Sequence, residues 1–154
     1  MNKNITAITP NIGLGDIKFG FTRNQVKEIL GEPTEIDAFA YDEDEIEELT
    51  ESWHYDELEF SCSFDESEDW KMINISVSSD KFKLENEDVI GLKKTELIAL
   101  IEKLNLGEID EDGENDVVTV LDSQINFWFD TDEVSEVQWS VNWNEDDSPM
   151  FPKQ

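Results

Sequence analysis

Cysteine and histidine are almost absent from this chain, and their scarcity excludes several classes of site. Of the 154 residues, only Cys62 is a cysteine and only His54 is a histidine. A disulfide framework within the chain therefore cannot form, which fits a reducing compartment. A transition-metal site needs several imidazole or thiolate ligands, so we expect no metal site and no cofactor.

Long apolar runs are also missing. No stretch approaches the roughly 20 apolar residues needed to cross a bilayer, and the first ten residues contain no apolar signal segment. These two observations predict a cytoplasmic protein that does not enter a membrane.

Basic residues are scarce and acidic residues abundant. The chain has 11 Lys and Arg against 39 Asp and Glu, which gives a formal net charge of −28. Such a field repels nucleic acid and anionic lipid and attracts basic proteins, most strongly at low salt. The composition therefore predicts a basic protein as partner, with no nucleic acid and no membrane. The alternative is that the acidity only maintains solubility or reflects a salt-rich habitat.

Two helices are predicted by apolar spacing and end signals. Val26, Ile29 and Leu30 follow a helical period, and Thr22 with Gln25 forms a capping box, so a helix is expected over 22–30. A second helix is expected between Gly91 and Gly107, with apolar residues at Leu97, Leu100, Ile101 and Leu104. The acidic residues 35–51 are consistent with either another helix or a solvated connection.

Alternating apolar residues after each helix predict strands. Each half is read as one helix followed by a three-stranded antiparallel meander, with solvated acidic runs at 42–48, 65–69 and 145–147. The predicted fold class is α+β, a single domain over 1–154 made of two tandem repeats, about 17–78 and 90–143. The repeats form one sheet with the helices on one face, and 144–154 is a C-terminal tail.

Matches between the halves support this interpretation. Gly20 matches Gly91 at 71 positions' distance, and Phe21 matches Leu92 at the same distance. In the strands, Phe60 matches Ile125 at 65 positions' distance. The offset falls from 71 to 65 because the connection between helix and strands is shorter in the second half.

The segment 17–33 carries a resemblance to a known family. It reads Ile17-Lys-Phe-Gly-Phe-Thr-Arg-Asn-Gln-Val-Lys-Glu-Ile-Leu-Gly-Glu-Pro33, and strands ending in a Phe-Asp turn follow it. It resembles the module of the β-lactamase inhibitor proteins and of the small outer-membrane assembly lipoproteins, clearly over 17–78 and more weakly over 90–143, where the proline is absent. In the inhibitors, tandem modules form a continuous sheet whose exposed face grips a target protein. Those relatives are exported, so their target is not transferred to this chain.

Alternation divides the strand residues between two faces of the expected sheet. One face is apolar and is expected to pack against the helices; it includes Cys62, Ile73, Ile75 and Phe129. The other is polar and surrounds one large aromatic residue, which suits recognition of a protein. Its predicted partner-binding residues are Trp128, Asn126, Asp130, Gln138, Ser140, Asn142, Ser61, Ser63, Glu59, Asn74, Ser76 and His54. The alternative is an ordinary solvated face.

Catalysis is not expected. Cys62 falls on the core face, so it cannot pair with His54 as an activated nucleophile. The segment 108–113 has the acidic spacing of a calcium loop, but position 12 is Thr119 in place of the bidentate Glu, and a strand follows.

These expectations combine into a functional hypothesis. The chain is read as a protein-binding inhibitor of the immunity type from a bacterial toxin–antitoxin system, which blocks a basic partner such as a nuclease toxin with carboxylates placed where phosphates would lie. One alternative is a structural or adaptor module whose acidity is incidental. Another is a small-molecule or calcium sensor.

Overall fold

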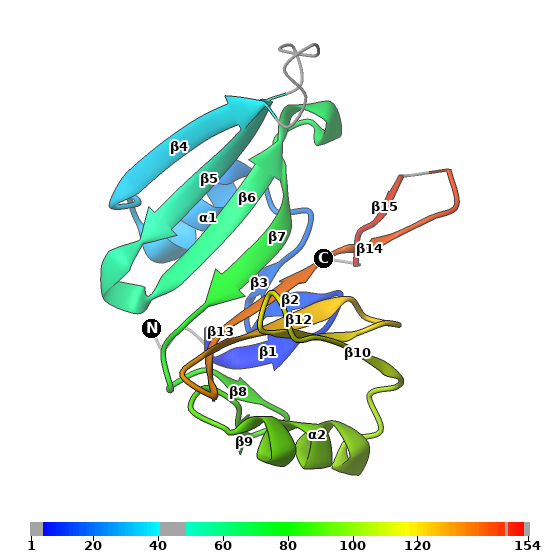
Figure 1. The fold of residues 1–154 in the computed structure, drawn as a ribbon. Coiled ribbons are helices and arrows are strands. Elements are labelled where there is room, and N and C mark those ends of the chain that lie inside the picture. Colours follow the sequence, from blue (N-terminus) through cyan, green and yellow to red (C-terminus); the bar gives the residue numbers. More distant parts are fainter. Residues whose placement is uncertain (1–4, 41–48, 147, 153–154) are drawn as a thin grey trace.

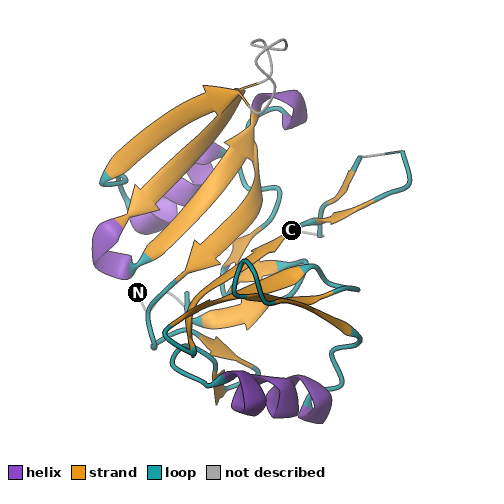
Figure 2. Ribbon diagram, in the orientation of Figure 1, coloured by secondary structure: helices purple, strands orange, loops and turns teal. Residues whose placement is uncertain are grey.

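The structure is a computed structural model that describes residues 5–40, 49–146 and 148–152. The predicted acidic run 42–48 and residue 147 lie outside the described residues. Strands account for most of the regular structure, as Figure 2 shows. In the described part of the chain, the two α-helices have 8 and 10 residues, and no helix is long and apolar enough to cross a membrane.

Eight strands form one large antiparallel sheet in the order β10-β11-β12-β13-β7-β6-β5-β4 (Figure 1). The two halves of the chain meet where β13 pairs with β7. The sheet is therefore continuous from one half to the other. Its strands are β4 (Glu35–Ala40), β5 (Leu49–Tyr55), β6 (Phe60–Asp65), β7 (Lys71–Val77), β10 (Ile109–Asp112), β11 (Val117–Val120), β12 (Ile125–Asp130) and β13 (Glu133–Ser140).

A smaller five-stranded sheet joins the N-terminal segment to the middle of the chain. Its order is β3-β2-β1-β8-β9, with β1 parallel to β8. Gly13 in β2 approaches β3 so closely that a Cβ there would lie 2.1 Å from the Ile17 carbonyl oxygen, and its φ of +154° favours glycine. The strands are β1 (Ala7–Thr9), β2 (Gly13–Leu14), β3 (Ile17–Lys18), β8 (Lys83–Leu84) and β9 (Glu87–Asp88).

Both predicted helices are present. α1 (Arg23–Leu30) begins after Thr22, whose Oγ1 accepts a hydrogen bond from the Gln25 N–H at 3.2 Å, while Gln25 Oε1 accepts one from the Thr22 N–H at 2.8 Å. The predicted capping box is therefore confirmed. α2 (Lys94–Lys103) buries Leu97, Leu100 and Ile101. Two short 3-10 helices, η1 (Asp56–Leu58) and η2 (Glu66–Glu68), connect strands of the large sheet.

One hydrophobic cluster fills the space between the large sheet, the helices and the small sheet. Along β6, Phe60, Cys62 and Phe64 are buried, and the serines between them are half-buried. The same alternation buries Ile125 and Phe127 in β12. Since successive strand residues point to opposite faces, one face of the sheet belongs to this core and the other remains open to solvent.

The predicted α+β fold class with three strands per repeat is wrong. The protein is mostly β, and each half contributes four strands to the large sheet. In the large sheet, the two unexpected strands are β4, in the acidic segment read as a helix or connection, and β10, in the acidic segment with the spacing of a calcium loop. The separate small sheet was not expected either, because a single sheet was predicted. Both are edge strands and mostly exposed, so neither has to bury one face. β10 has no apolar alternation, and in β4 the alternation is short, with Ile36, Ala38 and Ala40. The residues read as a tail contribute β15 (Pro149–Met150), which pairs with β14 (Asn142–Trp143).

The glycines matched between the halves make equivalent contacts. Gly20 donates to the Met72 carbonyl at 2.9 Å, and Met72 donates to Phe21. Likewise, Gly91 donates to the Val134 carbonyl at 2.8 Å, and Val134 donates to Leu92. Both glycines have a φ above +90°, a conformation that other residues rarely adopt.

Candidate functional site on the open face of the large sheet

The open face is the surface of the eight-stranded sheet that points away from the hydrophobic cluster. One cross-strand row of paired residues runs over all eight strands, and every side chain in it is polar. In order from β10 to β4, the row is Asp110, Thr119, Asn126, Gln138, Ser76, Ser61, His54 and Glu35. The two ends are carboxylates, while the six positions between them carry no Asp, Glu, Lys or Arg. The six middle positions of this row are therefore uncharged.

Hydrogen bonds orient the side chains of the row. Thr119 Oγ1 donates to Asn126 Oδ1 at 2.7 Å, and the indole N–H of Trp128 donates to Gln138 Oε1 at 3.4 Å. These bonds restrict the rotamers before any partner arrives, which reduces the entropy lost on binding.

His54 joins β4 to β6 across the open face. Its Nδ1 lies 2.9 Å from Ser61 Oγ, and its Nε2 lies 3.1 Å from Asp37 Oδ2. Beside this group, Ser52 Oγ and Ser63 Oγ are 3.1 Å apart. The N-terminal half of the open face is therefore a connected polar surface made of short side chains.

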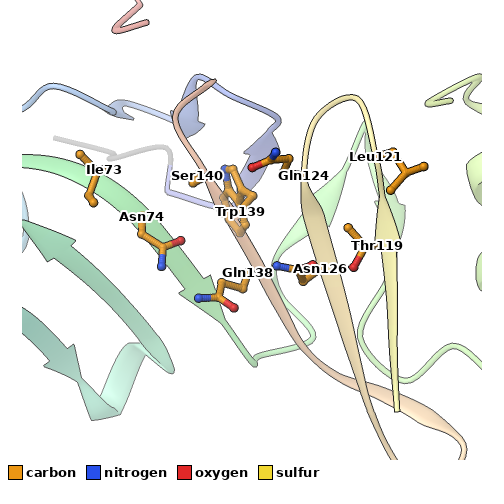
Figure 3. Close-up of a pocket in the computed structure, with 9 residues that line it drawn as sticks. All are labelled: Ile73, Asn74, Thr119, Leu121, Gln124, Asn126, Gln138, Trp139 and Ser140. Carbon is orange, nitrogen blue, oxygen red and sulfur yellow. Dashed lines mark hydrogen bonds between the residues drawn. The ribbon is translucent and has the colours of Figure 1, made fainter. Parts of the chain in front are cut away.

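A hollow of about 360 Å³, the central hollow, lies on the open face over β7, β13, β12 and β11 (Figure 3). Figure 3 shows Asn74, Gln138 and Asn126 reaching it from three adjacent strands, β7, β13 and β12. Amides can both donate and accept hydrogen bonds, so this lining suits uncharged polar groups of a partner. The full lining is Ile73, Asn74, Thr119, Leu121, Gln124, Asn126, Gln138, Trp139 and Ser140.

A second hollow, of about 210 Å³, brings carboxylates to the open face. Asp56, Glu59 and Glu136 line it beside the hydroxyl groups of Ser61 and Ser76. Tyr55, Phe60, Val77 and Ser78 complete the lining. Three carboxylates around a small hollow match a guanidinium or ammonium group, because such groups donate several hydrogen bonds to carboxylate oxygens.

A β-bulge leaves one predicted core residue only partly buried. The register between β6 and β7 shifts between Ser63 and Phe64, so that Phe64 pairs with Met72. Met72 is consequently fully buried, while Ile73 is only partly buried and lines the central hollow. Ile73, expected among the buried residues of the core face, packs against the core but is only partly buried, because simple alternation does not count the extra residue of a bulge. The other half has a register shift at Trp128/Phe129, and Phe129 there is half-buried.

Most of the sequence-predicted partner-binding residues come together on the open face, and two, Asp130 and Asn142, lie elsewhere. Asp130 is at the end of β12, paired with Glu133 beside the turn, and Asn142 belongs to the separate β14–β15 pair. Glu59 lies in no strand but follows η1 in a left-handed conformation and lines the carboxylate hollow. The open face itself holds Trp128, Asn126, Gln138, Ser140, Ser61, Ser63, Asn74, Ser76 and His54.

Several residues of the site were not predicted. Asp37 was missed because β4 was not recognised as a strand, and Gln124 because it lies in the turn between β11 and β12. Thr119 alternates with Val118 and Val120, and that signal could have assigned it to the open face.

The groups that could support other chemistry are placed unfavourably for it. Cys62 is buried on the core face, away from His54, and burial raises the pKa of its thiol. Asp112 accepts hydrogen bonds from the backbone of Glu114 and from Asn115 in the β10–β11 turn, and the Asn115 bonds lower the pKa of its carboxyl. Within residues 5–40, 49–146 and 148–152, no group of three His, Cys, Asp or Glu side chains is arranged to hold a metal ion.

Comparison with known proteins adds no family. No protein-family description, no curated protein and no solved structure matches this chain significantly. The resemblance noted over 17–78 therefore stays a prediction, and the functional argument depends on the residues of this chain.

Proposed function

We propose that this protein is a non-catalytic inhibitor of the immunity type, acting in the cytoplasm, which binds a basic protein such as a nuclease toxin through the open face. The observation that carries the proposal is the separation of charge on that face. The middle of the eight-strand row is uncharged, while the row ends and the carboxylate hollow hold Asp110, Glu35, Asp56, Glu59 and Glu136.

This separation suits the binding of a basic surface for two physical reasons. Removing a carboxylate from water costs free energy unless a cation replaces the water, whereas amides and hydroxyls are matched by any hydrogen-bonding group. The neutral groups of the row can therefore be desolvated by a partner, and the carboxylates at its two ends and in the hollow beside Ser61 and Ser76 can meet Lys or Arg. The net charge of −28 adds long-range attraction, which increases the association rate.

The capacity to block nucleic acid binding follows from the same groups. A nuclease holds phosphates in a groove lined with Lys and Arg, so carboxylates presented to that groove compete with the substrate. The carboxylate hollow places Asp56, Glu59 and Glu136 around one point of the open face.

Affinity capture from the native host tests the proposal. The immobilised protein is expected to retain a basic protein at low ionic strength, identified by mass spectrometry. With that protein purified, the association rate is expected to fall steeply between low and physiological salt, because the Debye length shrinks to about 8 Å. Recovery of no basic protein, or an association rate independent of salt, would contradict the proposal and favour an adaptor that docks through apolar contacts.

A further inference from the structure

The two edges of the large sheet differ in how well they are protected. β10, at one edge, has four residues, and three of them are acidic. β4, at the other edge, has six residues, Glu-Ile-Asp-Ala-Phe-Ala, with neither lysine nor proline. Figure 1 shows β4 as the outermost strand, and no strand of the described part of the chain pairs with its outer side. Natural edge strands are usually short, or carry lysine or proline, to prevent pairing with another chain.

The register shows which backbone groups of β4 point outward. In an antiparallel ladder, hydrogen-bonded and non-bonded pairs alternate along a strand. The Ser78 N–H donates to the Glu59 carbonyl, so the odd-numbered residues of β6 face β7 and the even-numbered ones face β5. The even-numbered residues of β6 pair with the odd-numbered residues of β5, so the even-numbered residues of β5 point their backbone groups toward β4. Their partners in β4 include Glu35 and Asp37, whose backbone groups therefore point toward β5. Ile36, Ala38 and Ala40 therefore present their N–H and C=O groups along the outer edge.

The side chains along β4 are accessible as well. Its first five residues are exposed; Ile36 retains 49% of its accessible surface and Phe39 38%. These two lie on opposite faces of the sheet, since Ile36 pairs with the core residue Trp53 and Phe39 with Thr50. An added strand would thus gain a row of backbone hydrogen bonds and an apolar contact on each face.

Charge decides between the candidate occupants. β4 carries two carboxylates, Glu35 and Asp37, and a second copy of the chain would bring its own net charge of −28 to the same edge. Repulsion of this kind opposes self-pairing, whereas a strand with Lys or Arg would be attracted.

We propose that the β4 edge is a second binding site, which accepts an extended basic segment of a partner protein as a ninth strand of the large sheet. Main-chain hydrogen bonds supply the affinity in this mode of recognition, and alternate side chains supply the selectivity. This inference rests on the proposed function in one respect: it takes from it that the partner is basic. It concerns a surface separate from the two hollows of the open face.

The test uses a defined probe, a fluorescently labelled ten-residue peptide that alternates lysine with valine and threonine. Its affinity for the full chain is measured by fluorescence anisotropy at low salt. Ala38→Pro removes an outward N–H and obstructs the edge while leaving the β5 ladder intact. The matched control is Glu111→Pro at the β10 edge. The Leu121 N–H donates to the Glu108 carbonyl, so the even-numbered residues of β10 face β11 and the backbone groups of Glu111 point outward.

Ala38→Pro is expected to weaken peptide binding by at least about tenfold, and Glu111→Pro to leave it unchanged. N-methylation of alternate peptide nitrogens is expected to abolish binding to the wild-type chain. Equal binding by Ala38→Pro and wild type, or full binding of the methylated peptide, would overturn the proposal by showing that charge alone holds the peptide. A wild-type dimer that Ala38→Pro dissociates in sedimentation would overturn it in favour of a second copy.

Failure here is distinguishable from failure of the proposed function. If Ala38→Pro captures the basic host protein as well as wild type does, the β4 edge does not bind the partner, and the proposed binding through the open face is unaffected. Circular dichroism of both proline variants checks that each is folded before the affinities are compared.

Discussion

The bulge in β7 gives a prediction that tests the geometry of the open face directly. Strict alternation would bury Ile73 and place Met72 outside the core, whereas with the register shift Met72 is fully buried and Ile73 only partly. Met72 has no exposed surface, so Met72→Ala removes buried atoms and leaves a cavity, at a cost of about 2–5 kcal/mol in the free energy of unfolding. Ile73 borders an open hollow, so Ile73→Ala removes only partly buried surface and creates no closed cavity. Its cost should be about 1 kcal/mol.

Urea denaturation followed by tryptophan fluorescence measures both variants. The urea concentration at the midpoint of unfolding should fall much further for Met72→Ala than for Ile73→Ala, while the m-value stays unchanged. A matched pair in the other half is Val134→Ala against Ser135→Ala, because Val134 is buried beside the second register shift and Ser135 is half-buried. If Ile73→Ala proves more destabilising than Met72→Ala, the bulge is misplaced and the central hollow has a different lining.

Two further predictions concern the helix ends and the acidic turns. Thr22→Ala should destabilise the protein by about 1 kcal/mol, because the Gln25 N–H loses its acceptor. Lys93→Thr should stabilise it by up to about that amount, because a lysine side chain at the N-cap of α2 cannot accept a hydrogen bond from the Glu96 N–H, whereas a threonine hydroxyl can. The melting temperature would shift by about 2–4 °C per kcal/mol. Glu68 has a raised pKa, mainly from burial and then from Asp65 and Asp69, so its ionised form destabilises the folded state above that pKa. Glu68→Gln should therefore raise the melting temperature at pH 7 and have no effect below the usual carboxyl pKa of about 4.3. A Glu68→Gln effect that grew on acidification would contradict this reasoning.

The sequence predicted those parts of the fold that depend on local signals. The capping box of Thr22 and Gln25 and the apolar spacing of Val26 identified α1, because both act within one turn of the chain. The alternation in Phe60, Cys62 and Phe64 likewise identified β6 and its buried face. Such strands must bury one side, and that requirement is visible in the order of residues.

The remainder depends on pairing between distant segments. β4 and β10 are strands because a neighbouring strand offers its free edge, which their own acidic sequences do not indicate. For the same reason, the contact of His54 with Asp37 could not be foreseen, since it needs β4 beside β5. The bulge at Ser63/Phe64 depends on register, and no residue of β7 signals it.

The measurement that tests the central claim most directly compares two variants with the same change in charge. Ser76→Arg places a long cation in the middle of the open face, and Thr95→Arg places one on the exposed surface of α2. Each variant is assayed for capture of the basic host protein at low salt. The account predicts that Thr95→Arg retains the partner as wild type does and that Ser76→Arg loses it. Retention by both variants, or an equal loss in both, would contradict the assignment of the open face as the binding surface.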